Sequence, residues 1–483
     1  MTFLISIINY YSPIFANSTA KEINMLTVHK IGGTSMTKFG EVVENIIIRQ
    51  ANGEDYYNRI FVVSAYNNVT NWLLEHKKTG APGVYDLFVK EDGFEIALAD
   101  LLQKLIGINR TFKDIGLDQQ VADAFITERI NQSKNYLNSL SEVLASGYVN
   151  KSNILLAARE ILASIGEAHS AFNSVNILQN RGINAHFTDL CGFNDSEYLT
   201  IDERIHNVFR RIDTSVTLPI ATGYTKGTEG IMREFDRGYS EVTFSKIAVE
   251  TKAAEAVIHK EYHLSSADPN IVGVENSRPV GQTNYNVADQ LADIGMEAIH
   301  PKASKPLELA GINIRIKNTF EPDHPGTLIT RNYRGVESKV EIISGTDRVM
   351  ALEVHDPLMV GQVGFDLKMM QLIERYNISY ILKATNANSI TMVVWEKDIS
   401  DELVAELGQT YFEVTAKKVA LVCALGTNIA RPGALAAATS ALHQNQINIE
   451  AVSQSLKQVN MQFVIERGDY KNAIIALNNA LCG

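Results

Sequence analysis

A lysine and two glycines follow an apolar segment near the start of the chain. Lys30 lies in the run Thr27–Ile31, and Gly32, Gly33 and Ser35 come directly after it. A glycine turn of this kind exposes backbone N–H groups beside a cation, which suits a phosphate chain. The segment predicts phosphate binding, although an ordinary turn with a surface lysine has the same pattern.

The elements that must position this turn follow a parallel α/β pattern. Thr27–Ile31 and Ile60–Ala65 are apolar strands, and a turn rich in helix-capping residues leads into a helix at Trp72–Lys77. Strand, turn, helix and strand in this order are typical of a parallel sheet. Residues 95–181 are predicted to be mostly helical, including the long run Lys151–Arg181.

The pattern continues to a loop that ends the first domain. Further strands are predicted at Ile183–Phe187, Val216–Ala221, Ala256–His259 and Ile312–Lys317. Further helices are predicted at Val242–Glu255, Ala288–Ile294 and Pro301–Ala310. The segment Asn318–Thr330, which contains two prolines and a glycine, is predicted to be a loop.

The remainder of the chain contains a repeat. Asn377–Tyr380 followed by Ile390–Trp395 resembles Gln446–Ile449 followed by Met461–Ile465, at an offset of roughly 70 residues. Each copy reads as strand, helix, two strands and helix, which is the split βαββαβ pattern. The predicted parts are an N-terminal extension at residues 1–24, a first domain at 25–332, and two small modules at 338–408 and 411–483.

Composition narrows the class of protein. A chain of 483 residues is too long for one core, so two or three domains are expected. Its net charge of −11 argues against nucleic acid or an anionic membrane as the main partner. The three cysteines lie far apart, which disfavours a disulfide framework or a thiolate zinc site and fits the cytoplasm.

The first 24 residues contain an apolar run without a basic segment before it. We interpret them as a disordered extension or a misassigned start, with an export signal as the alternative. The run is too short to span a membrane.

Several short motifs occur in a characteristic order and spacing. They are Lys30–Ser35, Val63–Ala65 with Val69–Asn71, Gly166–Glu167, Thr222–Tyr224, Arg237–Glu241, Ile299–Ala303, and Asn318–Phe320 with Pro325–Ile329. In these motifs the chain resembles the aspartokinases, members of the amino-acid kinase fold, from about Met25 to the C-terminus. The repeats resemble the paired ACT-like domains that such enzymes carry.

The resemblance implies transfer of the γ-phosphoryl group of ATP to the side-chain carboxylate of L-aspartate, with Mg²⁺ as cofactor. The product is an acyl phosphate, 4-phospho-L-aspartate. Because the acceptor is already an anion, no general base is required. The protein must instead offset the repulsion between two anions with cations and N–H dipoles.

The resemblance assigns catalytic roles to Lys30, Arg237 and Glu241. Lys30 contacts the transferring phosphoryl group, and Glu241 orients Lys30 or helps to hold magnesium. No metal-ligand set is assigned. The residues implied in nucleotide binding are Lys30, Gly32, Gly33, Ser35, Thr222, Gly223, Tyr224 and Lys260.

Aspartate binding is assigned, also by resemblance, to Thr70, Glu167, Arg237 and Ser240. The Glu167 carboxylate suits the substrate ammonium group. Arg237, assisted by Ser240, is matched to the α-carboxylate because a guanidinium binds a carboxylate in a bidentate fork. His300, in contrast, is interpreted as a packed loop residue rather than an acid or base.

Several residues depart from the usual pattern of the family. Tyr239 stands at a position that is usually glycine, which adds bulk beside the substrate, and Glu241 replaces an aspartate. Lys260 stands where the family usually has an aspartate, and Glu297 stands where it usually has a lysine. Because these two changes have opposite charge, we predict that Lys260 and Glu297 exchange roles across the nucleotide site. These deviations resemble the aspartokinase subgroup of ectoine biosynthesis clusters.

Two other functions stay open from the sequence. One is a kinase of another amino acid or of carbamate on the same fold. The other is a catalytically weakened sensor whose C-terminal modules bind an amino acid. The retained residues Lys30, Thr70, Glu167 and Arg237 favour the active aspartokinase.

The ACT-like modules imply at least a homodimer, because their exposed sheets commonly pair. Feedback by lysine or threonine is a further expectation. An effector is expected at Asn388 and Ser389, or at Gln446–Ile449 near Pro432 and Gly433.

Overall fold

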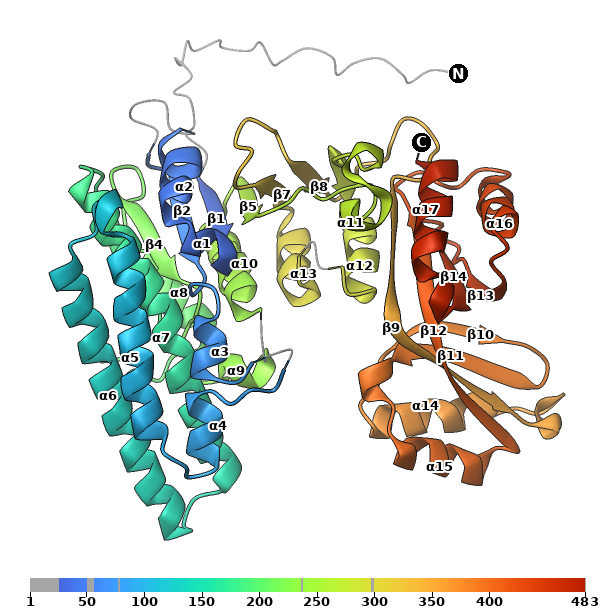
Figure 1. Ribbon diagram of the computed structural model, residues 1–483, viewed down its shortest axis with the longest axis horizontal. Coiled ribbons are helices and arrows are strands. Elements are labelled where there is room, and N and C mark those ends of the chain that lie inside the picture. Colours follow the sequence, from blue (N-terminus) through green and yellow to red (C-terminus); the bar gives the residue numbers. More distant parts are fainter. Residues whose placement is uncertain (1–25, 50–55, 77–78, 236–237, 297–298, 483) are drawn as a thin grey trace, which may run out of the picture.

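The computed structural model describes residues 26–49, 56–76, 79–235, 238–296 and 299–482 (Figure 1). The predicted N-terminal extension lies outside these ranges, and so do Arg237 and Glu297.

An eight-stranded sheet forms the centre of the first domain, in the order β3-β4-β2-β1-β5-β7-β8-β6. Neighbouring strands are parallel except for the antiparallel pair β7 and β8. The strands are β1 (Thr27–Ile31), β2 (Arg59–Val63), β3 (Ala185–Thr188), β4 (Leu218–Thr222), β5 (Glu255–Lys260), β6 (Gln282–Asn284), β7 (Asn313–Asn318) and β8 (Thr327–Thr330). Since parallel strands end at one edge, the carboxyl ends of β1, β2, β4 and β5 meet there.

Helices cover this sheet and extend one side of the domain. They are α1 (Gly33–Thr37), α2 (Phe39–Val42), α3 (Val69–Leu73), α4 (Val84–Val89), α5 (Phe94–Thr111), α6 (Gln119–Ser146), α7 (Lys151–Asn180), α8 (Ile201–Phe209), α9 (Ile231–Glu234), α10 (Tyr239–Glu250), α11 (Pro269–Val272), α12 (Tyr285–Asp293) and α13 (Pro301–Ala310). The long helices α5, α6 and α7 lie side by side (Figure 1). α7 packs against β3 and β4, whereas α10 packs against β1.

Most predicted elements are confirmed, and three differ for identifiable reasons. The helix predicted at Trp72–Lys77 is α3, which begins at Val69 and ends at Leu73, because Glu75 already forms a β-bridge with Pro82. The helix predicted at Val242–Glu255 begins at Tyr239 and ends at Glu250, because Glu255 already belongs to β5. The predicted loop Asn318–Thr330 contains the strand β8. β8 forms through pairing with β7 and β6, and partner strands distant in sequence leave no local signal.

The C-terminal part is one six-stranded antiparallel sheet, in the order β10-β11-β9-β12-β14-β13. Helices α14 and α15 cover one apolar core, and α16 and α17 cover another (Figure 1). The elements are β9 (Ile342–His355), α14 (Phe365–Arg375), β10 (Tyr380–Thr385), β11 (Ser389–Trp395), α15 (Asp401–Thr410), β12 (Glu413–Leu425), α16 (Ala434–Gln444), β13 (Ile449–Ser453), β14 (Asn460–Glu466) and α17 (Tyr470–Leu481).

The two repeats share their long strands. The second half of β9 and the first half of β12 pair beside β11, and the other halves pair beside β14. Each module therefore takes its fourth strand from the other, across the predicted boundary near residue 410. The boundary between the two repeats stays a prediction, since the sheet continues across it.

Among the helices of the described ranges, none is both long and apolar enough to cross a membrane.

Candidate active site

Lys30 is held at the carboxyl edge of the sheet with a charged partner. β1 lies between β2 and β5, so the Lys30 backbone is fixed from both sides. Its Nζ lies 3.4 Å from Glu241 Oε1, and each side chain is 12% exposed. The cation is thus positioned before any substrate arrives, as electrostatic catalysis requires.

The turn after β1 requires a glycine at one of its two glycine positions. A Cβ on Gly33 would lie 2.7 Å from the Ala65 carbonyl oxygen, whereas a Cβ on Gly32 would make only ordinary contacts. Gly33 therefore lets the turn pack against the end of β2. This close approach brings the predicted phosphate turn beside the segment that leads into α3.

Glu241 is ionised although it is buried. Burial alone would raise the pKa of Glu241, but the charges of Lys30 and Lys260 and the N–H of His300 together lower it. The His300 N–H donates to Glu241 Oε2 at 2.8 Å. The His300 ring accepts from Lys302 N and caps α13, which agrees with its interpretation as a packed loop residue.

The N-terminus of α10 brings Ser240 and Glu241 to the same place. Gly238 precedes the helix with φ of +85°, a conformation that favours glycine. The first residues of α10 are buried, and the Glu241 N–H donates to the Gly238 carbonyl at 2.9 Å. The N-terminus of a helix as long as α10, which has 12 residues, favours a nearby anion.

Glu167 presents an unsatisfied oxygen. It lies within α7 and is 2% exposed. Its Oε1 accepts from Ser240 Oγ at 3.4 Å, and its buried Oε2 has no hydrogen-bond partner among the described residues. Burial raises the pKa of Glu167 to about 7. A buried carboxylate in this state favours a bound ammonium group, which would restore its charge.

Tyr239 fills the space beside this carboxylate. Its ring packs edge-on against Tyr224, and its side chain is buried. Burial raises the pKa of Tyr239 well above its usual value, the charge of Glu167 and a hydrogen bond with Glu167 raise it further, and a hydrogen bond with Thr70 lowers it. The bulky residue predicted to crowd the substrate therefore contributes a neutral hydroxyl next to Glu167 and Thr70.

A cavity of about 280 Å³ joins these groups. The predicted residues that line it are Lys30, Gly33, Thr70, Glu167, Ser240 and Glu241. Sequence reasoning did not assign Thr34, Asn67, Asn68 and Asn71, which also line it. The three asparagines had a visible signal, because they belong to the turn that was interpreted only as a helix cap.

The other predicted nucleotide residues lie outside this lining. Ser35 Oγ lies within hydrogen-bond distance of Glu261 and Thr319, at 3.3 and 3.1 Å. Gly32 lies on the same side, where an added Cβ would be 3.8 Å from a Glu261 oxygen. Lys260 ends β5, near enough to Glu241 to lower its pKa.

The Thr222–Tyr224 motif makes internal contacts. Thr222 Oγ1 accepts from Leu190 N and donates to the Tyr224 carbonyl. A Cβ on Gly223 would lie 2.6 Å from Ser240 Oγ, and Tyr224 donates to Glu160 at 2.6 Å. These contacts position β4 against α10, and nucleotide binding by this motif stays a prediction. Arg237 lies outside the described residues.

Two buried histidines pair between β1 and β5. His29 Nδ1 is 3.0 Å from His259 Nε2, and these residues immediately precede Lys30 and Lys260. Burial lowers the pKa of His29 far below its usual value and that of His259 to about 3. Both rings are neutral near pH 7, because burial and the positive charges of Arg59 and Lys317 disfavour the protonated form.

The residues present fit a magnesium ion held chiefly by a nucleotide. Mg²⁺ in phosphate-transferring sites is bound through one or two carboxylates, phosphates and water. Within the described ranges, no group of three His, Cys, Asp or Glu side chains converges on one point. Glu241 offers the single ionised carboxylate beside Lys30 in the cavity lining.

Two hollows of the C-terminal part lie at or near the places predicted for an effector, although Gln446–Ile449 themselves line neither. One, of about 330 Å³, is lined by Asn388 and Ser389 together with His355. The other, of about 390 Å³, is lined by Pro432 and Gly433 at the start of α16.

Comparison with known proteins agrees with the fold. A model of the amino acid kinase family matches residues 25–318, and an ACT domain model matches residues 422–481. The relative "Aspartate kinase Ask_Ect" of Stutzerimonas stutzeri (strain A1501) is 45% identical over 463 residues, which are 95% of this chain and 97% of the relative.

Two solved structures share the architecture. E. coli aspartokinase III in complex with aspartate and ADP has a TM-score of 0.70 at 18% identity, over 95% of this chain and 100% of that one. The aspartate kinase of Clostridium acetobutylicum has a TM-score of 0.67 at 21% identity, over 94% of this chain and 100% of that one. At such identities the likeness shows the fold.

Proposed function

Because the chain belongs to the aspartokinases of the amino acid kinase family, we propose that its cavity transfers the γ-phosphoryl group of ATP to the side-chain carboxylate of L-aspartate. The product is 4-phospho-L-aspartate. One observation carries this assignment: the Lys30–Glu241 pair and the unsatisfied Glu167 carboxylate line the same cavity.

Lys30 is proposed to stabilise the transferring phosphoryl group. A bond forms between an aspartate carboxylate oxygen and the γ-phosphorus, the bond to the bridging oxygen breaks, and ADP leaves. Negative charge spreads over the phosphoryl oxygens during this step. Lys30 offsets that charge, and Glu241 holds the Lys30 side-chain ammonium group in place. The N-terminus of α10 adds N–H dipoles.

Glu167 is proposed to bind the aspartate ammonium group. Its free Oε2 supports this role, because an ammonium group would satisfy an oxygen that otherwise lacks a partner. Thr70 lines the same cavity and is proposed to contact aspartate, with Ser240 beside Glu167. Binding of the α-carboxylate by Arg237 stays a proposal from the resemblance.

The nucleotide is proposed to lie over the turn after β1 and the end of β5. Gly32, Ser35 and Lys260 gather there, as their shared neighbour Glu261 and the effect of Lys260 on Glu241 indicate. Mg²⁺, when bound, would neutralise phosphate charge, with Glu241 as its proposed protein ligand.

Pathway, regulation and assembly belong to the same proposal. The similarity to the relative named Ask_Ect supports the predicted ectoine subgroup. The hollows at Asn388 and at Pro432 support an amino-acid effector. A homodimer and a cytoplasmic location remain predictions from the sequence.

The test is ATP turnover with L-aspartate and magnesium, in which hydroxylamine traps the acyl phosphate as a hydroxamate. We expect hydroxamate with the wild type and at least about a hundredfold less with Lys30→Ala. Lys246→Ala is the matched control, since Lys246 lies on α10 but pairs with Asp202 at the surface.

Absence of hydroxamate from a folded wild type would refute the assignment. Nucleotide binding without turnover would then support the sensor. Turnover with another amino acid in place of aspartate would support a different kinase of the same fold.

A further inference from the structure

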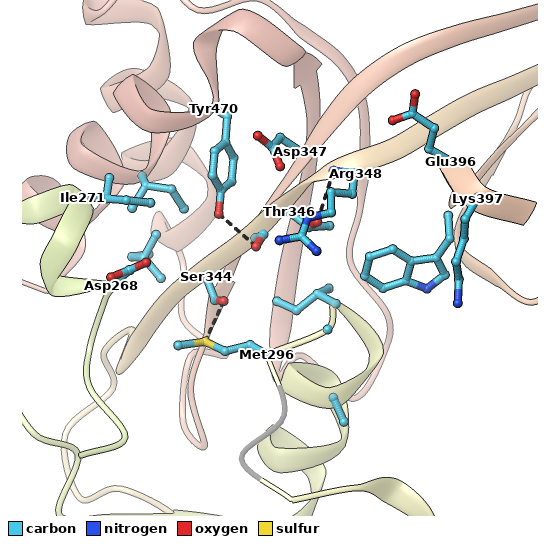
Figure 2. A pocket seen from close by; sticks show the side chains of 17 residues that line it. Asp268, Ile271, Met296, Ser344, Thr346, Asp347, Arg348, Glu396, Lys397 and Tyr470 are labelled. Carbon is cyan, nitrogen blue, oxygen red and sulfur yellow. Dashed lines mark hydrogen bonds between the residues drawn. The ribbon is translucent and has the colours of Figure 1, made fainter. Parts of the chain in front are cut away.

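A cavity of about 1010 Å³ lies between the catalytic domain and the regulatory sheet (Figure 2). This interdomain cavity is lined by α11, the end of α12, β9, the end of β11 and α17. Ser344 donates to Met296 Sδ at 2.9 Å (Figure 2). The Trp395 ring packs against Gly295, where an added Cβ would lie 2.7 Å from the indole. Close contacts therefore fasten the two domains at the wall of this cavity.

The interdomain cavity and the candidate active site differ in the burial of their polar groups. Asp347 and Arg348 lie on a β-bulge of β9, where they together oppose the single residue Ala420, and both are exposed. In the candidate active site, buried polar groups contact one another and so have a fixed geometry. Tyr239 lines that cavity beside Glu167 without an assigned role.

Two glutamates of α7 each meet a tyrosine. Glu160 and Glu167 lie about two helical turns apart, which places them on one face of the helix. Tyr224 donates to Glu160 Oε2 at 2.6 Å, and Tyr239, the first residue of α10, forms a hydrogen bond with Glu167. The two tyrosine rings pack edge-on, with their centroids 6.0 Å apart. The same pairing of side chains thus occurs twice, side by side.

The two pairs differ in how completely the carboxylate is satisfied. Both oxygens of Glu160 have donors, since Met232 N donates to its Oε1 at 2.7 Å. Glu167 Oε1 accepts from Ser240 Oγ, whereas the buried Oε2 has no hydrogen-bond partner among the described residues. The first pair is complete by itself, and the second lacks one donor.

The Tyr239 hydroxyl links Glu167 to Thr70. The hydrogen bond with Glu167 raises the pKa of Tyr239, which is the effect of donating, and the bond with Thr70 lowers that pKa, which is the effect of accepting. Burial raises the pKa of Glu167 to about 7, and the bond from Tyr239 acts against this rise. Since Thr70 and Glu167 line one cavity, the hydroxyl joins two groups that are proposed to bind aspartate.

We propose that Tyr239 is a positioning residue for the acceptor amino acid. Its hydroxyl holds the Glu167 carboxylate so that Oε2 is left to the ammonium group of aspartate, and its buried ring, packed against Tyr224, excludes water beside that carboxylate. This inference rests on the proposed binding of aspartate by Glu167. It gives a role to a bulky residue at a position where the family usually has glycine.

The other titratable groups around Glu167 are paired or neutral. Among the described residues of the cavity lining, Lys30 and Glu241 are the other ionised side chains, and they pair with each other. Burial raises the pKa of one thiol and two phenols near Tyr239, which stay neutral near pH 7: Cys191, Tyr66 and Tyr224. A change in aspartate affinity near pH 7 should therefore report the protonation of Glu167.

The test measures binding of L-aspartate by the full chain at several pH values, by calorimetry and as KM in the hydroxamate assay. Tyr239→Phe keeps the ring but cannot donate, so the protonated form of Glu167 is favoured. A hydrogen bond to a charged group changes an equilibrium about tenfold, so affinity should begin to fall about one pH unit higher than in the wild type. The KM for aspartate at pH 7 should then rise about fivefold, and the KM for ATP should not change.

Tyr285→Phe is the matched control. Tyr285 is also buried and is also the first residue of a helix, α12. Its hydroxyl donates to the Ile312 carbonyl, and neither residue lines the catalytic cavity. This variant should keep the wild-type pH profile of aspartate binding, and circular dichroism checks that both variants fold.

Three outcomes would overturn the role of Tyr239. They are an unchanged pH profile in Tyr239→Phe, an equal shift in Tyr285→Phe, and a loss of aspartate affinity in Tyr239→Phe that is the same at every pH. Calorimetry detects aspartate binding even where no hydroxamate forms, so failure of this inference is distinguishable from failure of the proposed phosphoryl transfer. Absence of aspartate binding by the wild type would overturn both.

Discussion

The proposed catalytic cavity and the cavity between the two domains hold their charges in opposite ways. Lys30 and Glu241 are each 12% exposed and face each other across the first. Asp347 and Arg348 are exposed on a bulge in the second. Charges that are fixed beforehand can stabilise a transition state without reorganisation. Charges in contact with water are screened and are not held in one geometry.

The two cavities also differ in where the fold places them. The catalytic cavity lies at the carboxyl edge of a parallel sheet, where several strands end together. The interdomain cavity lies where β9 passes from one module to the other, against the end of α12. The two cavities therefore lie at different places in the fold, one at the edge of the parallel sheet and one between the two domains.

The largest effect is expected at the fixed charge. Lys30→Ala should lower kcat by roughly 10²–10³-fold, because one preorganised cation is lost from the transition state. Steady-state kinetics with ATP and L-aspartate measure this loss. Lys246→Ala should differ from the wild type by less than about twofold, since a surface ion pair contributes little. Equal losses of kcat in the two variants would contradict a role of Lys30 in stabilising the transferring phosphoryl group.

The next effect concerns pH and aspartate affinity. The pKa of Glu167 is raised to about 7 in the absence of substrate, so acidification protonates it and removes the partner of the ammonium group. The KM for aspartate should therefore rise about tenfold for each pH unit below 7, and stay level above it. Glu167→Gln should raise KM and remove this dependence. A pH profile that survives in Glu167→Gln would contradict the role.

The buried histidine pair predicts a loss of stability in acid. The pKa of His259 is lowered to about 3 by burial, whereas an unfolded histidine titrates near 6.5. The unfolded state thus binds more protons, and the free energy of unfolding should fall as the pH drops from about 6.5 toward 4. In His259→Gln, the free energy of unfolding, measured with urea at several pH values, should fall less steeply as the pH drops. His443→Gln, at an exposed site on α16, is the control and should retain the wild-type dependence.

The smallest effect is expected at the domain contact. Gly295→Ala and Gly311→Ala both place a Cβ at positive φ, which costs about 1–2 kcal/mol of stability. Only Gly295 has a neighbour, the Trp395 ring, within 4 Å of the added atom. The Gly295 variant should therefore lose more stability and shift the tryptophan emission. Equal melting temperatures and unchanged emission would show that the Trp395 contact does not fasten the domains.

The sequence predicted the catalytic cavity better than the interdomain cavity for a physical reason. The turn at Lys30, the helix residue Glu167 and the α10 start at Ser240 each lie in a short contiguous motif. Motifs of this kind carry their own turn and cap chemistry. The interdomain lining joins single residues such as Met296 and Arg348 from elements that have no local signal in common.

By itself, the sequence predicted the parallel α/β domain and the two repeats, because hydrophobic periodicity and glycine turns are local properties. The family resemblance of its short motifs pointed to six of the residues that line the candidate cavity. Tertiary structure alone decided the strand β8, the exchange of strands between β9 and β12, and the bulge at Asp347 and Arg348. It also decided that Glu167 keeps one oxygen without a partner. Pairing between distant strands and the burial of a charge depend on which segments meet, and no short stretch of sequence encodes that.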